Sequence, residues 1–242
     1  MNILDFVRIE TSTVKDGNMS HTYGEKEEVN SNRRKFWMKN GFKYDNTYLL
    51  RTSFEKLDNV KVLNTLPNGF TVVQDVDSVL TNNRDVVLAL LTADCLQITL
   101  YDSKHSVLGL IHAGFKWQDA RIIDNTFKVM ENEFDSEPKD VLIHLGNCIS
   151  PEYYRWDSNI FKYIDKESWI GKTIEKDNHK EKPYRIDIRK AAILNLKDIG
   201  VRDENIIDSN VDCYSDRNYY SHVRSVYSNE PDSRHITLVQ MK

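Results

Sequence analysis

The chain has little of what marks secreted, membrane or nucleic-acid-binding proteins. Three cysteines in 242 residues are an odd, sparse set, which argues against a disulfide framework and for a reducing compartment. The longest apolar stretch, residues 86–93, is too short to cross a bilayer. Basic and acidic residues nearly balance, 33 against 37, without a basic block, so we expect no nucleic-acid binding. The first residues show no secretory signal, and we expect a soluble cytoplasmic protein.

Most of the candidate chemistry lies in one central block of the sequence. Three apolar runs of five or six residues, rich in leucine and β-branched side chains, predict buried strands. Asp94 and Cys95 stand between the first and second runs, and His112 follows the third. The 17 positions from Cys95 to His112 (112 − 95) allow one strand out and one back. If these strands pair, the thiol and the imidazole meet at one end of a sheet. The three runs are residues 86–91, 96–101 and 107–111.

The rest of the chain alternates strand and helix patterns without a repeat or a linker. This alternation favours one α/β or α+β domain over residues 1–242. The polar stretch 165–182 predicts an exposed loop, and Asp157 could cap a short helix. Further strands are expected within residues 3–13, 48–51, 60–63, 70–73, 141–145, 184–188, 206–207 and 235–240. Helices are expected at residues 25–39, 117–134 and 189–199.

Residue type alone leaves several roles open for the central residues. Cys95 and His112 could ligate a metal such as zinc, or His112 could activate Cys95 as a nucleophile. Inert packing of a buried cysteine and a hydrogen-bonded histidine is the simpler interpretation. Asp94 could orient a site group or cap the following turn. Lys116 could meet a phosphate at a helix start or face solvent.

A second cluster of candidates lies near the C-terminus. In the segment 219–224, aromatic faces such as Tyr219 could stack a base beside His222, with Arg224 near an anion. Packing of these aromatic side chains on the core is the competing interpretation, and residue type alone favours it.

The central block resembles a known family. Thr92-Ala93-Asp94-Cys95 and Ile111-His112-Ala113-Gly114-Phe115 are similar to the TADC and HAGWRG motifs of laccase-domain proteins. That family was formerly called multicopper polyphenol oxidases and is now regarded as purine nucleoside phosphorylases. Weaker similarities follow in the same order along nearly the whole chain. They are Ser12-Thr13, Asn32-Arg33, residues 77–81, residues 145–154 and Tyr219-Tyr220-Ser221-His222 with Arg224.

The resemblance implies a fold and an activity. The fold is a single α+β domain with a layered α/β/β/α arrangement, in which packed mixed sheets are covered by helices, similar to cysteine hydrolases. The activity is phosphorolysis of adenosine, inosine and methylthioadenosine, with an accompanying adenosine deaminase activity. The family site holds zinc through two histidines and one cysteine, and Cys95 and His112 match two of these ligands. Its substrates are a purine nucleoside and phosphate.

The resemblance also suggests roles for the other candidates. Asp94 would join Cys95 and His112 as a catalytic residue. The phosphate or the ribose would contact the basic side chains, and the purine would contact the rings. The residues expected to bind substrate are Lys116, Phe115, Tyr219, His222 and Arg224.

The sequence departs from the family pattern at the metal site. Phe54 takes the place of the family's other histidine, so zinc binding should be weak or absent unless His21 or His222 substitutes. Lysine replaces the arginine of HAGWRG, which loses bidentate contact to phosphate. These losses leave two alternatives to a metal-dependent phosphorylase. One is a non-catalytic relative that binds a nucleoside or a partner protein, and the other is metal-free hydrolysis by a Cys95–His112 pair.

Overall fold

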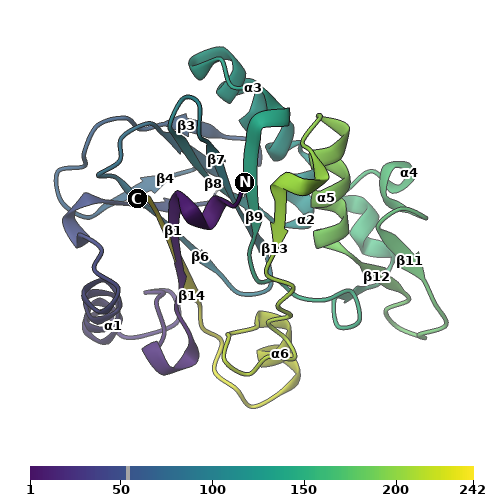
Figure 1. Cartoon of the computed structure of the whole chain (residues 1–242). Coiled ribbons are helices and arrows are strands. Elements are labelled where there is room, and N and C mark those ends of the chain that lie inside the picture. Colours follow the sequence, from purple (N-terminus) through teal and green to yellow (C-terminus); the bar gives the residue numbers. More distant parts are fainter. Residues whose placement is uncertain (53–54) are drawn as a thin grey trace.

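Two large mixed β-sheets form the centre of the molecule. The structure is a computed structural model that describes residues 1–52 and 55–242 (Figure 1). A five-stranded sheet has the order β1-β14-β6-β2-β4, and a six-stranded sheet has the order β13-β9-β7-β8-β5-β3. The first sheet contains β1 (Val7–Thr11), β14 (His235–Met241), β6 (Val87–Thr92), β2 (Thr47–Arg51) and β4 (Thr71–Gln74). The second contains β13 (Ile206–Asp208), β9 (Val141–Leu145), β7 (Leu96–Asp102), β8 (Val107–Ala113), β5 (Ser78–Thr81) and β3 (Val60–Val62).

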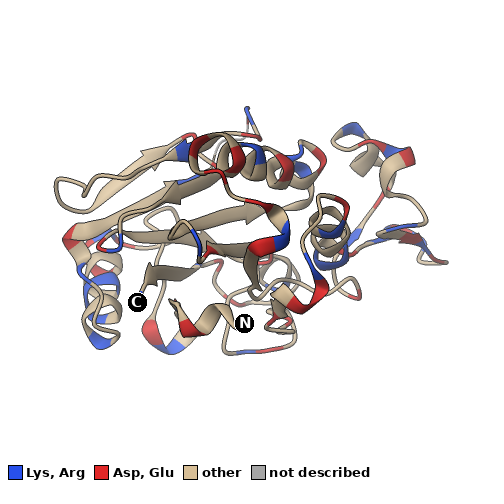
Figure 2. Cartoon of the chain, turned by 45° about the horizontal axis from the view of Figure 1, so that its top comes forward, with Lys and Arg blue, Asp and Glu red and all other residues tan. Residues whose placement is uncertain are grey.

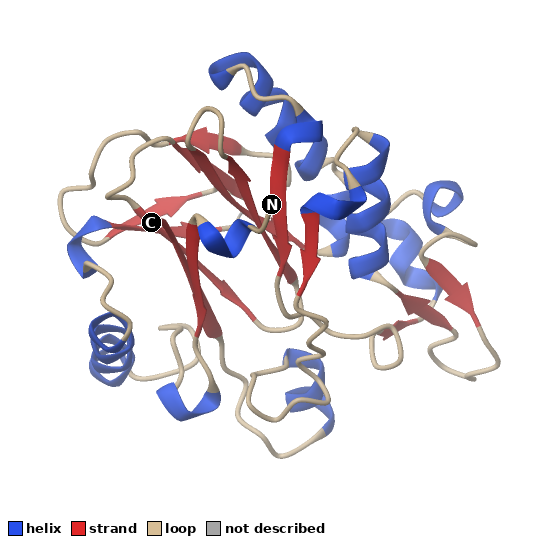
Figure 3. Cartoon of the chain, viewed as in Figure 1, coloured by secondary structure: helices blue, strands red, loops and turns tan. Residues whose placement is uncertain are grey.

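Helices cover the outer face of each sheet, as the blue and red ribbons of Figure 3 show. The buried side chains form one cluster between the two sheets, where Leu90 and Leu110 take part, and one cluster on each outer face. Phe127 packs in the cluster outside the six-stranded sheet, and Trp37 in the cluster outside the five-stranded sheet. The helices of the described chain are α1 (Lys26–Lys39), α2 (Phe115–Asp119), α3 (Ile122–Phe134), α4 (Lys166–Trp169), α5 (Ile188–Asp198) and α6 (His222–Tyr227). The predicted α+β class and its α/β/β/α layers are confirmed.

Burial of the central strand β8 on both faces explains why its sequence is apolar without alternation. Leu108 and Leu110 point into the cluster between the sheets, whereas Val107 and Ile111 point into the cluster under the helices. A strand that is buried on both faces carries apolar residues at every position. The run 107–111 therefore reads as a continuous hydrophobic segment.

The β7–β8 hairpin sets the position of the central motif. Its antiparallel register pairs Gln97 with His112 and Leu96 with Ala113. Cys95 directly precedes β7 and Gly114 directly follows β8. Because opposed residues and residues two apart share a face of a sheet, Cys95 and His112 lie on one face at the same end of the hairpin. The predicted path, one strand out and one back, is confirmed.

A small third sheet lies beside the six-stranded sheet. It has the order β10-β12-β11, with β10 (Arg155–Trp156), β12 (Tyr184–Ile186) and β11 (Ile174–Lys176). Asp157 caps the short 3-10 helix Ser158–Lys162, as expected, by accepting the N–H of Asn159. This sheet and the following turn form one side of the cavity described below.

Several parts of the chain differ from the sequence prediction, which did not include strands β5 and β10. The helix expected at 117–134 is divided in two, because Arg121 adopts a left-handed conformation with φ 64° between α2 and α3. The stretch 165–182, expected to be a loop, contains α4 and β11. Helix α6 was not predicted, since its sequence HVRSVY is too short to show a period.

Charge is distributed over the whole molecule. Figure 2 shows basic and acidic residues interleaved along helices and loops, while the large sheets carry few of them. None of the described helices is both long enough and apolar enough to cross a membrane.

Candidate active site

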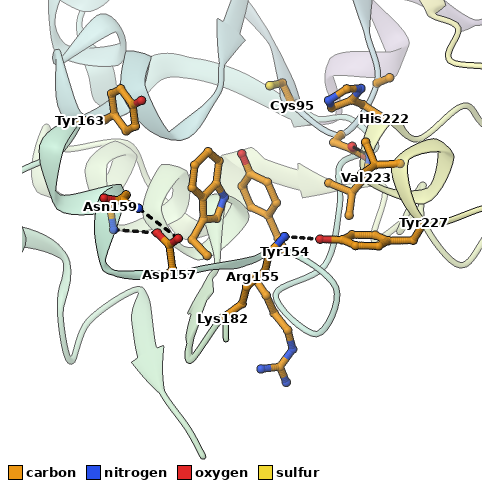
Figure 4. A pocket seen from close by; sticks show the side chains of 14 residues that line it. Cys95, Tyr154, Arg155, Asp157, Asn159, Tyr163, Lys182, His222, Val223 and Tyr227 are labelled. Atoms are coloured by element: carbon orange, nitrogen blue, oxygen red, sulfur yellow. Dashed lines mark hydrogen bonds between the residues drawn. The ribbon is translucent and has the colours of Figure 1, made fainter. Parts of the chain in front are cut away.

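A cavity of about 410 Å³ opens beside the end of the β7–β8 hairpin (Figure 4). One wall is α6, the opposite wall is the segment 154–163, and Cys95 lies at the inner end. Lys182 and Tyr227 approach each other at the mouth, where the Lys182 ammonium donates to the Tyr227 hydroxyl. The lining residues are Ala93, Asp94, Cys95, Tyr154, Arg155, Trp156, Asp157, Asn159, Tyr163, Lys182, His222, Val223, Val226 and Tyr227.

Cys95 faces the cavity as a protonated thiol. Burial raises its pKa to about 12, and the negative charge of Asp94 adds to that effect, while Arg234 opposes it. A thiol with this pKa contributes almost no thiolate near neutral pH. Gly114 lies directly beside it, because a Cβ atom at that position would stand 3.1 Å from the sulfur.

Asp94 fastens helix α6 to the start of β7. Its Oδ2 atom accepts the backbone N–H of Val223 at 2.7 Å, and its Oδ1 atom accepts the Cys213 thiol at 3.4 Å. Burial raises the pKa of Asp94, and hydrogen bonds from Ser221 and Val223 oppose this rise. The residue has φ 85°, a left-handed conformation that Asp tolerates better than most side chains. Asp94 thus holds the α6 wall of the cavity in place.

His112 lies at the same sheet end as Cys95 but does not open into the cavity. The Trp117 ring packs edge-on against the imidazole, with 4.2 Å between ring centroids. The indole N–H of Trp117 donates to Asp77 at 2.7 Å, which fixes the ring there. Burial lowers the pKa of His112 to about 4, so the ring is neutral near pH 7. The Cys95 thiol lines the cavity and the His112 imidazole does not, so the prediction that both groups open into one cavity is wrong.

The described residues do not fit a zinc ion. No group of three or more His, Cys, Asp and Glu side chains among residues 1–52 and 55–242 is arranged to hold a metal. Phe54, the position where the family resemblance places a third ligand, lies outside the described residues. His21, one suggested substitute, has its Nε2 atom 2.9 Å from Asn30 and lies outside the cavity lining. The other, His222, lines the cavity near Cys95 without completing such a group.

The Arg224 side chain stabilises the structure of the protein and is not accessible to a ligand. Its guanidinium is buried and donates to the carbonyl oxygens of Cys213, Tyr214 and Tyr219 at 2.6–2.8 Å. A further bond of 2.6 Å reaches the carboxylate of Glu230. These contacts close the loop before α6, and they leave the guanidinium directed into protein rather than toward a phosphate.

The other three residues predicted to bind substrate, Tyr219, Phe115 and Lys116, are not among the residues that line the cavity. Tyr219 packs against His235, with ring centroids 5.7 Å apart, and is outside the cavity lining. Phe115 supports the cavity wall from behind, because its ring packs edge-on against Trp156 at 5.3 Å. Lys116 places its ammonium 3.7 Å from the centre of the Tyr163 ring. Of the predicted residues, the structure thus brings Cys95, Asp94 and His222 together at the cavity.

Sequence reasoning missed most of the wall opposite α6. Tyr154, Trp156 and Tyr163 line it, together with the polar side chains of Asp157 and Asn159. The available signal was the aromatic density of the stretch 153–163, YYRWDSNIFKY, which lies beside turn residues. Aromatic faces in such a segment are typical of sites that hold flat ligands.

The family of the chain follows from its similarity to known proteins. A model of the family described as multi-copper polyphenol oxidoreductase laccase matches residues 9–242, so the chain belongs to this family. The similar curated proteins carry the name purine nucleoside phosphorylase. A relative from Rickettsia conorii is 26% identical over 195 residues, which are 76% of this chain and 79% of that protein. YlmD from Bacillus subtilis is 28% identical over 155 residues, or 64% of this chain and 55% of that protein.

The alignments to some curated relatives are partial. A protein from Bacteroides thetaiotaomicron is 27% identical over 130 residues, or 54% of this chain. The chain spans about half the length of this relative and of Bacillus subtilis YlmD, at 48% and 55%.

Solved structures share the fold. The hypothetical protein YfiH from Bacillus licheniformis superposes with a TM-score of 0.83 at 20% identity, covering 98% of this chain and 93% of that one. YlmD from Geobacillus stearothermophilus has a TM-score of 0.78 at 20% identity, covering 93% and 84%.

Proposed function

We propose that the cavity binds a purine nucleoside and that the chain cleaves its N-glycosidic bond with phosphate. The observation that carries this proposal is the aromatic lining, because Tyr154 and Trp156 line a cavity of about 410 Å³ together with Cys95 and His222. Ligand sites of roughly 300–1,000 Å³ with a few convergent polar groups suit small molecules of nucleoside size. The family membership supports the same substrate class.

The cavity offers distinct surroundings to each part of the substrates. The purine would lie against the faces of Tyr154 and Trp156, since flat rings stack favourably on aromatic side chains. Asp157 and Asn159 present polar atoms suited to ribose hydroxyls. Lys182 supplies a positive charge at the mouth that suits phosphate, which would displace the Tyr227 hydroxyl from the ammonium.

The reaction needs no electrophile other than the sugar carbon. A phosphate oxygen attacks C1′ of the ribose, the C1′–N9 bond breaks, and its electron pair leaves with the purine. The side chains of the cavity then have to exclude water and hold phosphate in line with the breaking bond. No step of this proposal depends on a metal.

The test is direct. Purified protein is incubated with phosphate and adenosine, inosine or methylthioadenosine, and free base and pentose 1-phosphate are measured; inosine formed from adenosine reports deaminase activity. We expect phosphate-dependent release of base, and at least tenfold lower kcat/KM for Trp156→Ala. Tyr44→Ala is the matched control, because Tyr44 packs with Trp37 and Phe70 outside the five-stranded sheet. If no base is released by the protein, either with added metal or without it, the proposal is refuted.

A second candidate function is nucleoside binding without turnover. Two observations favour it: the Cys95 thiol is protonated, and the His112 ring packs against Trp117 and does not line the cavity. It predicts a thermal shift with inosine that Trp156→Ala abolishes, together with no base release. Measuring both quantities on the same preparation separates the two candidates.

A further inference from the structure

His222 presents an imidazole to the cavity and is held from behind by a carboxylate. It is the first residue of α6 and lines the cavity with Cys95 and Tyr154. Figure 4 shows its ring beside Cys95, and about half of the side-chain surface, 51%, is exposed. The Nδ1 atom stands 2.8 Å from Oδ2 of Asp232. With Nδ1 engaged, Nε2 is the ring nitrogen available to a ligand.

Asp232 is itself fixed in position and in charge. Arg234 donates to its Oδ1 atom at 2.5 Å and to the Tyr23 hydroxyl at 2.7 Å. The same guanidinium stacks 4.1 Å from the centre of the Tyr23 ring. Burial tends to raise the pKa of Asp232, but the hydrogen bond and charge of Arg234 and the contact with His222 outweigh it and lower the pKa. The carboxylate is therefore ionised and oriented toward His222.

Three other groups that line the same cavity, Cys95, Tyr154 and Asp94, are poorly suited to move a proton near neutral pH. Burial raises the pKa of Cys95 to about 12, and burial likewise holds the pKa of the Tyr154 phenol well above its usual range. Both oxygens of Asp94 are engaged by Val223 and Cys213. His222 is an imidazole with an oriented carboxylate partner, the arrangement that serves general acid–base catalysis in many enzymes.

We propose that His222, oriented by Asp232, is the general acid that protonates the departing purine. This inference rests on the proposed phosphorolysis. As the C1′–N9 bond breaks, its electron pair moves into the imidazole ring of the purine, and N7 takes the proton from Nε2 of His222. The phosphate oxygen forms the new bond to C1′, and the proton that the bound hydrogenphosphate releases to solvent balances the one that restores His222. Asp232 holds the ring and balances its charge while it carries the proton.

The experiment compares two substrates in His222→Gln. Inosine needs a proton at N7 to leave as neutral base, whereas 7-methylinosine already carries a positive charge on that ring and leaves without one. We expect His222→Gln to lower kcat for inosine about 100- to 1,000-fold, within the usual range for a general acid, and to change kcat for 7-methylinosine by less than about threefold. Asp232→Asn should show a smaller loss with the same substrate dependence.

A matched control is available elsewhere in the chain. His105 also places its Nδ1 atom close to an aspartate, 2.7 Å from Oδ2 of Asp102. That pair lies in the turn between β7 and β8, at the opposite end of the hairpin from Cys95. His105→Gln should therefore leave kcat for both substrates unchanged.

The outcomes separate the two proposals. Wild-type protein that cleaves neither substrate refutes the phosphorylase function, and the role of His222 with it. If wild-type protein is active and His222→Gln is equally slow on both substrates, the residue only maintains the structure of the site. If His222→Gln is as fast as wild type on inosine, another group supplies the proton. Either of these two results overturns the assignment of His222 alone.

Discussion

Replacing Asp94 should loosen the cavity wall and lower the stability of the whole chain. Asp94→Ala removes the acceptor that Val223 reaches at 2.7 Å and leaves that backbone N–H, at the start of α6, without its partner. A bond to a charged acceptor is worth about 1.5–3 kcal/mol, and a buried donor left unsatisfied costs about 1–3 kcal/mol. Both figures describe the loss of the same hydrogen bond, so they are not added in full. We expect a loss of about 2–4 kcal/mol in the free energy of unfolding.

Asp94→Asn is the conservative partner of this variant. Asparagine also tolerates the left-handed backbone conformation of φ 85° and keeps an oxygen for Val223. It removes a buried charge, so its cost should be about 1 kcal/mol or less. Urea unfolding of both variants, followed by fluorescence and circular dichroism, measures these differences.

The pH dependence gives a second check on Asp94. Because burial raises its pKa in the folded protein, the native state binds more protons than the unfolded state between the usual pKa of 3.8 and the raised value. The contribution of Asp94 to stability therefore falls as pH rises through that window. Asparagine does not titrate, so Asp94→Asn should become relatively more stable against wild type as pH rises. An Asp94→Ala cost below about 0.5 kcal/mol, or a difference that changes with pH in the opposite direction, would refute this role.

Two further predictions concern the protonation states of Cys95 and of two buried histidines. With a pKa of about 12, Cys95 should react slowly with iodoacetamide at neutral pH and faster toward pH 10, as peptide mapping can measure; rapid labelling at pH 7 would contradict its protonated state. Burial lowers the pKa of His112 to about 4 and that of His235 to about 3, so below pH 6.5 the unfolded state binds more protons and stability falls. Each histidine should contribute up to about 1.4 kcal/mol per pH unit in that range. Urea titrations should show a smaller slope in His235→Asn, and equal slopes would argue against a buried neutral ring.

The sequence predicted the centre of the fold well because burial leaves a strong local signal there. Strands such as β7 and β8 are buried along their whole length, so most of their positions are apolar. Helix α3 carried a clear period of three and four residues. Its start was misplaced because the break at Arg121 is a backbone conformation, which leaves no mark in the hydrophobic pattern.

The candidate site was less predictable because segments distant in the sequence build it. Cys95 was identified from its motif, but the identity of its neighbours depended on tertiary packing. Trp117 shows the difference, since it stands at a helix start in the sequence and packs edge-on against His112 in the structure. Likewise Arg224 matches a family motif, yet three backbone carbonyls and Glu230 surround its guanidinium. Hydrogen-bond partners of this kind cannot be read from spacing alone.

The cavity wall joins the middle of the chain to its last quarter. Asp94 accepts a hydrogen bond from Val223 of α6, although the two residues are 129 positions apart in the sequence. Contacts between such distant positions form after local structure in most folding reactions, because closing a long loop costs entropy first. The cavity is therefore complete only once the C-terminal segment has docked. A ligand that binds only the complete cavity stabilises the docked segment, so saturating ligand should protect α6 from proteolysis as well as raise the melting temperature.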